Sequence, residues 1–369
     1  MGAPLELLFT GDLVLDVPDP DHWLSGIAPL TRLAQLTIGH LEVPHTRRGA
    51  ELQTDVPAPG AEPAYLAALQ RAGFDAVTLA GNHIADRGAQ GIADTRDGLD
   101  QLGIKHCGAG PNLAAARAPA YLSAGNRCVA LLSYNCVGPQ EGWASAEHAG
   151  CAYVRIETAD GSAIAPSAPL QQAQPASLAA LAKDILEAGR HSDLIVVALH
   201  KGIVHTPARL APYERPVSHF AIDVGADIVV SHHAHIVRGM EIYGGKPIYH
   251  GLGNGCVVTH ALDPEQSHPA RAQWAKRRRQ LFGFEPDPTY PLAPFHPEAI
   301  HALLARVLCH DNGRIEAGFV PVYVEPPGRP VLADTAFSQK VVDYIMRITE
   351  QAGLPSLSMT QRDDMVVLS

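Results

Sequence analysis

Hydrophobic residues along this chain gather in short, nearly unbroken runs that end in polar residues. The clearest runs cover residues 5–10, 36–41, 74–80, 127–134, 194–199 and 228–230. Such runs, rich in β-branched residues, are typical of strands buried inside an α/β sheet. Apolar residues with helical spacing lie between them, over residues 63–72, 91–102, 176–188, 214–224 and 337–352. This alternation predicts an α/β protein with a mixed sheet arrangement.

The other segments complete this expectation. Strand pairs are predicted around Gly244-Gly245 and around the turn at 311–313, the latter joining residues 300–308 and 314–324. Residues 138–175 are rich in Ala, Ser, Gly and Pro and predict a loop with one short strand, whereas the Pro- and charge-rich residues 262–297 predict an insertion or lid. We see no internal repeat and no convincing linker. Residues 1–369 are therefore interpreted as a single domain, with 325–369 as a C-terminal helix–strand extension.

Composition narrows the class of protein. A chain of 369 residues with 46% hydrophobic residues can bury a large core. The net charge of −10 argues against a nucleic-acid partner, because phosphate backbones select for basic surfaces. The one basic run, at residues 276–279, is interpreted mainly as a solvated helix face, with contact to an anionic substrate as the alternative.

Localisation signals are missing from the sequence. The first ten residues lack the features of a signal peptide, and no stretch approaches the roughly 18 apolar residues of a membrane span. Six cysteines without paired short spacing favour reduced, mostly buried thiols. We therefore expect a cytoplasmic protein without membrane contact, and a homo-oligomer is compatible with this composition.

Five apolar runs deliver polar groups of the ligand type where they end. Carboxylate, amide oxygen and imidazole together are the ligand set of a site for Mn, Fe or Zn. Ligand sites in open α/β sheets collect at the carboxyl ends of the strands. The pattern predicts one or two divalent metals held by a selection from Asp12, His40, Glu42, Asn82, His83, His200, His232, His233 and His235. For Asp12 the alternative is a turn-forming role, and for His83 a hydrogen bond to the backbone.

These residues also carry a family resemblance. Gly11-Asp12, Gly81-Asn82-His83, His200-x-Gly202 and His233-Ala-His235 resemble the motif series of the calcineurin-like metallophosphoesterases. The nearer likeness is to the CapA branch, the capsule or poly-γ-glutamate synthesis proteins. The other motifs of this branch correspond here to His40-Leu41-Glu42, to Gly108 to Leu113 and to Gly245 to Asn254. The resemblance spans about residues 5–256 and implies a four-layer α/β/β/α sandwich of the metallo-dependent phosphatase type, with the site at the strand ends.

The resemblance also implies roles for single residues. The metal ligands would be Asp12, Glu42, Asn82, His200, His233 and His235. A metal-bound hydroxide would attack a phosphoester or an amide-type bond, and His83 would protonate the leaving group. In this interpretation His83, Asp12 and Glu42 are the catalytic residues of a metal-dependent hydrolase.

This chain departs from the family pattern at three places. Val14 stands where the phosphoesterases have a histidine, His40 replaces the asparagine of Asn-Leu-Glu, and Val204 follows where CapA chains show an acid. His40, His205 and His232 are possible additional neutral ligands. We further expect Lys201, Arg87 and His250 to contact an anionic small-molecule or peptide-like substrate.

Two other functions remain open from the sequence. A CapA-like peptide epimerase moves an α-proton without a metal, and Glu42 or Asp12 together with His83 could supply the acid and base for that reaction. A non-catalytic partner in capsule or poly-γ-glutamate synthesis is the third possibility.

Overall fold

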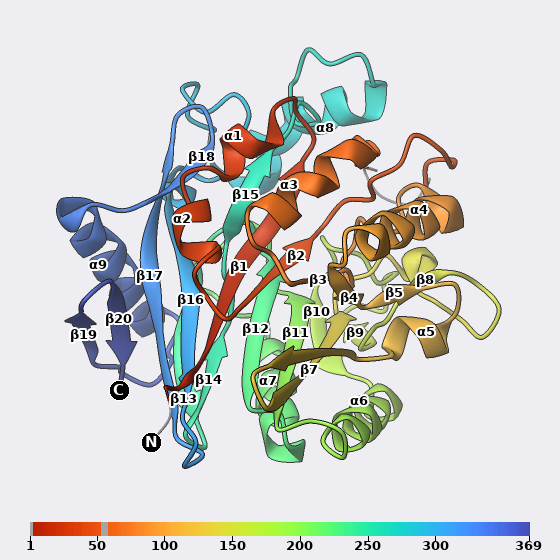
Figure 1. Cartoon of the computed structure of the whole chain (residues 1–369). Coiled ribbons are helices and arrows are strands. Elements are labelled where there is room, and N and C mark those ends of the chain that lie inside the picture. Colours follow the sequence, from red (N-terminus) through yellow and green to blue (C-terminus); the bar gives the residue numbers. More distant parts are fainter. Residues whose placement is uncertain (1–2, 53–57) are drawn as a thin grey trace.

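Two β-sheets packed face to face form the centre of the computed structural model, which describes residues 3–52 and 58–369 (Figure 1). The large sheet joins parallel strands from the first third of the chain to antiparallel strands from the last third. In order across the sheet these are β19 (Met359–Arg362), β20 (Met365–Leu368), β17 (Ile315–Glu325), β16 (His301–Cys309), β1 (Leu5–Leu15), β2 (Leu36–Leu41), β3 (Ala76–Thr78) and β4 (Lys105–Cys107), with β15 (Asn254–Val258) beside β1 and β18 (Arg329–Leu332) beside β17.

The small sheet has a parallel centre and antiparallel edges. Its strands, in order, are β13 (Met240–Tyr243), β14 (Lys246–Tyr249), β12 (Ile228–His233), β11 (Leu194–Lys201), β7 (Arg127–Asn135) and β6 (Ala120–Ala124). Every residue of β11 and β12 is buried, as expected for parallel strands that are covered on both faces.

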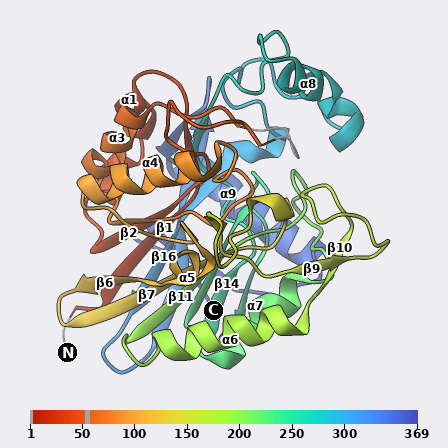
Figure 2. The ribbon, with the colours of Figure 1, turned by 90° about the vertical axis from the view of Figure 1, so that its right-hand side faces the viewer.

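Helices cover the outer face of each sheet, so that the strands lie between two helical layers (Figure 2). Over the large sheet lie α1 (Pro20–Leu24), α2 (Ala28–Thr31), α3 (Leu66–Arg71) and α4 (Gly88–Gln101); over the small sheet lie α6 (Pro175–Ala188) and α7 (Glu214–Val224). Further elements are α5 (Leu113–Arg117), α8 (Pro269–Phe282), α9 (Thr335–Gln351) and the 3₁₀ turns η1 (Pro63–Tyr65), η2 (Gln140–Gly142) and η3 (Pro297–Ile300). This arrangement confirms the expected four-layer α/β/β/α sandwich.

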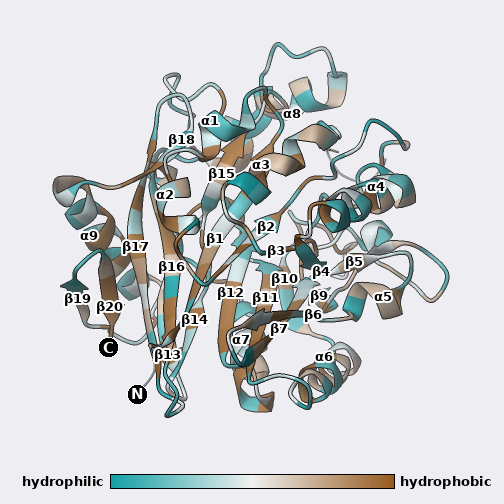
Figure 3. Ribbon diagram, viewed as in Figure 1, coloured by the Kyte–Doolittle hydropathy of each residue, from teal (hydrophilic) through white to brown (hydrophobic). Residues whose placement is uncertain are grey.

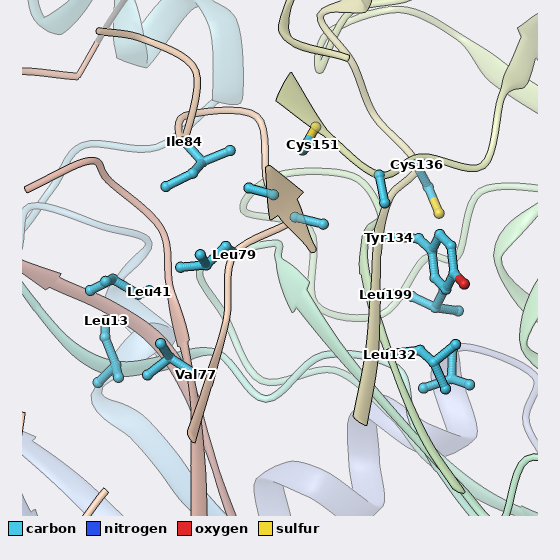
Figure 4. Packing of buried hydrophobic residues seen from close by; sticks show 14 of the residues in the cluster. Leu13, Leu41, Val77, Leu79, Ile84, Leu132, Tyr134, Cys136, Cys151 and Leu199 are labelled. Carbon is cyan, nitrogen blue, oxygen red and sulfur yellow. The ribbon is translucent and has the colours of Figure 1, made fainter. Parts of the chain in front are cut away.

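Alternation along each strand divides the hydrophobic residues between two cores. On β11, Val196 and Ala198 face the other sheet, whereas Val197 and Leu199 face the helices. The strands are accordingly the most hydrophobic part of the chain, and the helices carry polar outer surfaces (Figure 3). Figure 4 shows the outward-facing residues of both sheets, with Leu13, Leu41 and Val77 on one side and Leu132, Tyr134 and Leu199 on the other.

The last 45 residues are built into this sandwich. Tyr344, Ile345 and Ile348 of α9 belong to the core between the sheets, and the Tyr344 hydroxyl donates to the carbonyl of Val237 (3.0 Å). Strands β18, β19 and β20 extend the large sheet. The predicted C-terminal helix–strand segment therefore completes the central layers.

Two local predictions were wrong. The first strand does not end at Thr10: β1 continues to Leu15, because β-bulges around Asp12 let its second half pair with β2 and β15. Residues 138–175 contain more than one strand, namely β8 (Gly150–Cys151) paired with β5 (Ala109–Gly110), and β9 (Ile156–Thr158) paired with β10 (Leu170–Ala173).

The cysteines are free, and all but the half-buried Cys128 are buried. This agrees with the expectation of reduced, mostly buried thiols. Among the described residues, no helix combines the length and the apolar character needed to cross a membrane.

We predict that Gly11→Ala destabilises the sandwich. A Cβ at residue 11 would lie 2.0 Å from the carbonyl oxygen of Gly253 and 2.9 Å from the backbone nitrogen of Gly255, and backbone atoms cannot yield as a flexible side chain can. We expect the free energy of unfolding in urea to fall by about 2–3 kcal/mol. Gly189→Ala is the control, because its Cβ meets the end of the Ile195 side chain, at 3.2 Å. Equal stabilities of the two variants would contradict the prediction.

Candidate metal site between the two sheets

Histidines occupy the last inward-facing positions of strands from both sheets. On β2 the inward residues are Leu36, Ile38 and His40; on β11 they end in His200, and on β12 in His232. Because β11 and β12 are parallel and in register, His200 and His232 are paired neighbours. The inter-sheet core is therefore apolar along the strands and changes to imidazole where these strands end.

The imidazole rings pack against one another. The ring of His40 lies 4.7 Å from that of His200 and 4.7 Å from that of His232, measured between centroids. His233 follows at the end of β12, with its ring 4.8 Å from His200. All four side chains are almost completely buried.

Two carboxylates adjoin these rings. Asp12 lies in the bulge of β1, opposite His40 on β2, and accepts a hydrogen bond from the backbone N–H of His233 (3.2 Å). Glu42 follows β2, and its Oε1 lies 3.3 Å from Nε2 of His235. Nδ1 of His235 in turn lies 2.9 Å from Oδ1 of Asn254 and 3.7 Å from Oδ2 of Asp12.

The geometry offers two groups of ligand atoms that share one carboxylate. Asp12, His40 and His200 form the first group, and Asp12, Glu42 and His235 the second, with the ligand atoms of each group within 4.8 Å of one another. A shared carboxylate between two groups of three is an arrangement in which two cations can lie side by side.

Unpaired nitrogen atoms show that these residues fit a metal. The Nε2–H of His200 donates to Oδ1 of Asn82 (2.7 Å), and Nδ1 of His40 is hydrogen bonded to the Thr78 hydroxyl (2.9 Å). The other ring nitrogen of each, and both ring nitrogens of His233, have no partner among the described residues. Buried polar atoms normally have one. The donor set is that of a borderline divalent cation.

A glycine leaves room for this cluster. A Cβ on Gly81 would lie 3.0 Å from Nε2 of His40 and 3.3 Å from Cε1 of His200. Any side chain at residue 81 would therefore press on the two rings.

The charges of the cluster are coupled. Burial raises the pKa of Asp12 well above its usual range, and the nearby Glu42 raises it further. Burial by itself would also raise the pKa of Glu42, but its interactions with His235 outweigh that effect and bring the pKa down to about 2. Burial lowers the pKa of His235, yet Glu42 and Asp12 raise it to about 9. The His235 imidazolium therefore lies beside Glu42 and Asp12, in a place where a divalent cation would stabilise the charged form of both carboxyl groups.

The backbone is strained around these histidines. His205, His233 and His235 have φ angles of 54°, 92° and 53°, in the left-handed region that favours glycine. Non-glycine residues in this conformation are concentrated at functional sites, where the surrounding structure holds them in place.

His83 lies at the open side of the cluster with an aspartate behind it. Its Nδ1–H donates to Oδ2 of Asp86 at 2.6 Å, and the His83 side chain is 21% exposed whereas Asp86 is buried. His83 is near enough for its charge to lower the pKa of Asp12 and Glu42, against the effect of burial. The hydrogen bond to Asp86 thus orients the imidazole of His83. Asp86 was not among the site residues that we proposed from the sequence, although it stands three residues after His83.

Lys201 and His250 lie elsewhere than we expected. Strand alternation turns Lys201 to the opposite face from His200, where its Nζ lies 3.1 Å from Oε2 of Glu214 and 3.1 Å from Nδ1 of His250. Both side chains are completely buried under α7. A substrate contact is therefore replaced by a buried ionic network, which continues to Arg238 and Glu241.

Arg87 lies beside an open polar hollow of about 370 Å³. Its Nη1 is 3.4 Å from Oε1 of Glu51, and both residues line this hollow together with Asp16 and Glu62. The expected contact of Arg87 with a substrate remains a prediction.

Residues 262–297, which we call the lid segment, pack against the cluster next to His205 and His235. Aromatic rings of this segment surround His205, with centroid distances of 4.7 Å to Phe282 and 5.3 Å to Phe284, and the ring of Phe295 stacks on His235 at 4.9 Å. The basic run lies on α8, and Arg278 within it is only 2% exposed. The interpretation of the whole run as a solvated helix face was therefore wrong for Arg278; the side chain of Arg279 lies outside the described residues.

The structure shows where two residues that depart from the family pattern, Val14 and His40, lie relative to the cluster. Val14 belongs to the core between the sheets and offers no ligand. His40, in register with Asp12 on the neighbouring strand, brings an imidazole to the same place. Asn254, which pairs with Asp12 through β15 and holds His235, was absent from our candidate residues; the Gly-Asn that ends the 245–254 motif was the available signal.

Comparison with known sequences gives a family. Residues 6–257 match the model of a family described as "Bacterial capsule synthesis protein PGA_cap". A relative from Mycobacterium tuberculosis, described as a "Probable polyglutamine synthesis accessory protein", is 34% identical over 180 residues, which are 48% of this chain and 43% of the relative. The capsule biosynthesis protein CapA of Bacillus anthracis is 29% identical over 187 residues, 51% of this chain and 41% of that protein. The chain thus spans less than half the length of these relatives.

Among solved structures, the calcineurin-like phosphoesterase YfkN from Bacillus subtilis is 11% identical, with a TM-score of 0.35 over 95% of this chain and 98% of that one.

We predict that Glu214→Gln destabilises the protein. Glu214 is the carboxylate between two completely buried cations, Lys201 at 3.1 Å and Arg238 at 2.6 Å. Its replacement leaves both without a counter-charge, and we expect a loss of about 3–5 kcal/mol in the free energy of unfolding at pH 7. Glu187→Gln, which breaks exposed pairs with Arg190 and His191, should change it by less than about 0.5 kcal/mol.

The stability difference between the wild type and Glu214→Gln should depend on pH. Burial by itself raises the pKa of Glu214, but Arg238 and Lys201 lower it from 4.5 to about 2. Ionised Glu214 therefore stabilises the folded state above pH 4.5, and this contribution is lost as the pH falls toward 2. The stability difference between wild type and Glu214→Gln should narrow over this interval. A difference that stays constant would contradict the assignment.

Proposed function

The chain belongs to the bacterial capsule synthesis protein family PGA_cap, and from this membership and the strand-end cluster we propose that it is a metal-dependent hydrolase of a phosphoester or an amide-type bond. The observation that carries the proposal is the pair of ligand groups that share Asp12. In the first group, one buried ring nitrogen each of His40 and His200 lacks a partner among the described residues.

Each ligand group has a distinct composition. Asp12, His40 and His200 would hold one cation, with Asn82 beside His200. Asp12, Glu42 and His235 would hold the other. His233 adds an imidazole next to His200, and His232 supports the ring of His40. When bound, a divalent metal such as Mn, Fe or Zn polarises a substrate oxygen and makes a water acidic enough to react near neutral pH.

The protein's own groups provide the rest of the chemistry. His83 and His235 are the members of the cluster that solvent reaches, with side chains 21% and 14% exposed, so the substrate would approach from their side. His83, oriented by Asp86, would give a proton from Nε2 to the leaving group. The buried ligands behind them exclude water from the other directions.

We expect an anionic substrate, because divalent cations held at Asp12 would attract negatively charged oxygen atoms. Two relatives are described as proteins of polyglutamine synthesis and of capsule biosynthesis. We propose that the substrate of this chain is a small-molecule or peptide-like anion cleaved at such a bond. No contact with nucleic acid is part of this proposal.

The first test is the metal content of the purified protein, offered Mn, Fe or Zn in excess and then desalted. We expect one to two equivalents per chain by elemental analysis, and at least about tenfold less in Asp12→Asn, because this carboxylate is common to both ligand groups. Asp160→Asn, on the exposed loop between β9 and β10, should bind as much metal as the wild type. A folded wild-type protein that takes up none of these metals would contradict the proposal.

The second test separates catalysis from metal binding. His83→Gln should bind the metals normally but lose about 10²–10⁴-fold in kcat, because it removes the proton donor and leaves both ligand groups intact. Hydrolysis of bis-p-nitrophenyl phosphate and of γ-glutamyl-p-nitroanilide provides the readout, with exposed His191→Gln as the control. Proton exchange at an α-carbon that survives a chelator would favour the epimerase instead, and inactivity of the metal-loaded wild type toward both compounds would count against a hydrolase.

A further inference from the structure

Arg278 of α8 is a buried cation that has no carboxylate partner within residues 3–52 and 58–369. Its side chain is 2% exposed, and Nε and Nη2 have no hydrogen-bond partner among the described residues. Burial lowers the pKa of Arg278 to about 10, so the guanidinium is still charged at neutral pH. The other two buried arginines that the structure describes have carboxylate partners: Arg238 pairs with Glu214, and Arg271 with Glu51. Arg278 thus needs an explanation that the folded chain alone does not supply.

Aromatic rings around the guanidinium stabilise its positive charge but give its N–H groups no hydrogen-bond acceptor. Cζ of Arg278 lies 5.4 Å from the ring centre of Trp274, 5.9 Å from that of Phe284 and 5.8 Å from that of Phe295. Ring faces attract a cation, but they offer no acceptor in the plane of the guanidinium. The planar N–H groups therefore remain available.

The two unpaired nitrogens lie on one edge of the guanidinium. Nε–H and Nη2–H point in parallel and form the fork that binds two oxygens of a carboxylate or phosphate at once. A pair of unsatisfied donors in this geometry is matched by an oxyanion better than by a single water molecule.

The Arg278 side chain lies near the candidate metal site, with aromatic rings between them. Phe295, which packs against Arg278, also stacks on His235 at 4.9 Å, and Phe284, another neighbour of Arg278, packs on His205. The lid segment is attached near the start of α8 by His268 and Arg271, which both bind Glu51. α8 thus holds Arg278 over the side of the cluster that contains His235.

We propose that Arg278 binds an oxyanion of the substrate, a carboxylate or a phosphate, when the lid segment closes over the metal site. This role of Arg278 rests on the proposed function, since it places a second recognition group beside the reacting bond. Arg278 would bind the part of the substrate that does not react, and that part would carry a negative charge. Because Nε and Nη2 are inaccessible in the closed protein, the anion enters only after the lid segment moves.

Binding of simple anions to metal-free protein tests this proposal. Glutarate and inorganic phosphate are titrated calorimetrically after treatment with a chelator, with neutral glutaramide as the matched probe. We expect glutarate or phosphate to bind and glutaramide not to bind, and Arg278→Met to weaken the binding about tenfold or more, because it loses a charged two-point contact. The anion that binds more tightly shows whether Arg278 recognises a carboxylate or a phosphate.

Two further variants make the outcome decisive. Arg277→Met removes the positive charge of an exposed neighbour on the same helix. We expect its affinity for the anions to stay within about twofold of wild type, because an exposed charge at a distance is screened by salt. This result would show that the weaker binding of Arg278→Met does not come from the lower net charge alone. Arg278→Lys keeps the cation but loses the fork, so it should fold and still bind more weakly. Without an anion, Arg278→Met should melt no lower than wild type, since it removes an unpaired buried charge.

Other results would overturn the inference. Equal affinity of wild type and Arg278→Met for both anions, or no binding to wild type, would contradict it. A lower melting temperature of Arg278→Met together with unchanged affinity would make Arg278 a purely structural part of the aromatic cluster. Because the titration uses metal-free protein, none of these results depends on whether the metal-loaded protein hydrolyses anything.

Discussion

Asp12 and Glu42 are two carboxylates buried beside each other at the end of the inter-sheet core, and most features of the site follow from the need to balance their charge. Burial of like charges is costly unless cations or hydrogen bonds compensate. Among the described residues, Asp12 accepts a hydrogen bond from the backbone N–H of His233, and Glu42 lies beside His235. The charge of His83 acts on both carboxylates from a greater distance. The unpaired imidazole nitrogens nearby are neutral donors of electron pairs. Both observations describe a site that a divalent cation would complete.

On the other face of β11, the buried charges are paired within the protein. One residue after His200, Lys201 enters a network with Glu214 and Arg238 in which each charge has a partner. Such a network is satisfied by the protein alone and has a structural role, holding α7 against β11 and β12. Adjacent residues of one strand thus serve two purposes, because alternation sends them into different layers.

The lid segment adds a third kind of buried charge. Arg278 is surrounded by rings, and its Nε and Nη2 have no acceptor in the part of the chain that the structure describes. In this respect it resembles the candidate metal site, whose buried ring nitrogens are also unpaired there. Phe295 contacts both Arg278 and His235 and joins the two incomplete sites. An anionic substrate bound between them would satisfy the cation of the lid, while a metal satisfies the carboxylates below.

The layers and the strand-end residues could be predicted from the sequence, because buried strands and helices leave different local periodicities and because turns after strands are visible as polar residues. The runs ending in His40, His200 and His232 are examples, and the structure brings all three together. Other features depended on contacts between distant segments. That β1 continues past Asp12 depends on pairing with β15, more than 240 residues away. Whether Lys201 faces a substrate or Glu214, and whether Arg278 faces water or the rings of Phe284 and Phe295, depends on which layer covers each position. Local sequence determines which residues can be buried, but only the packing of distant segments decides what each one is buried against.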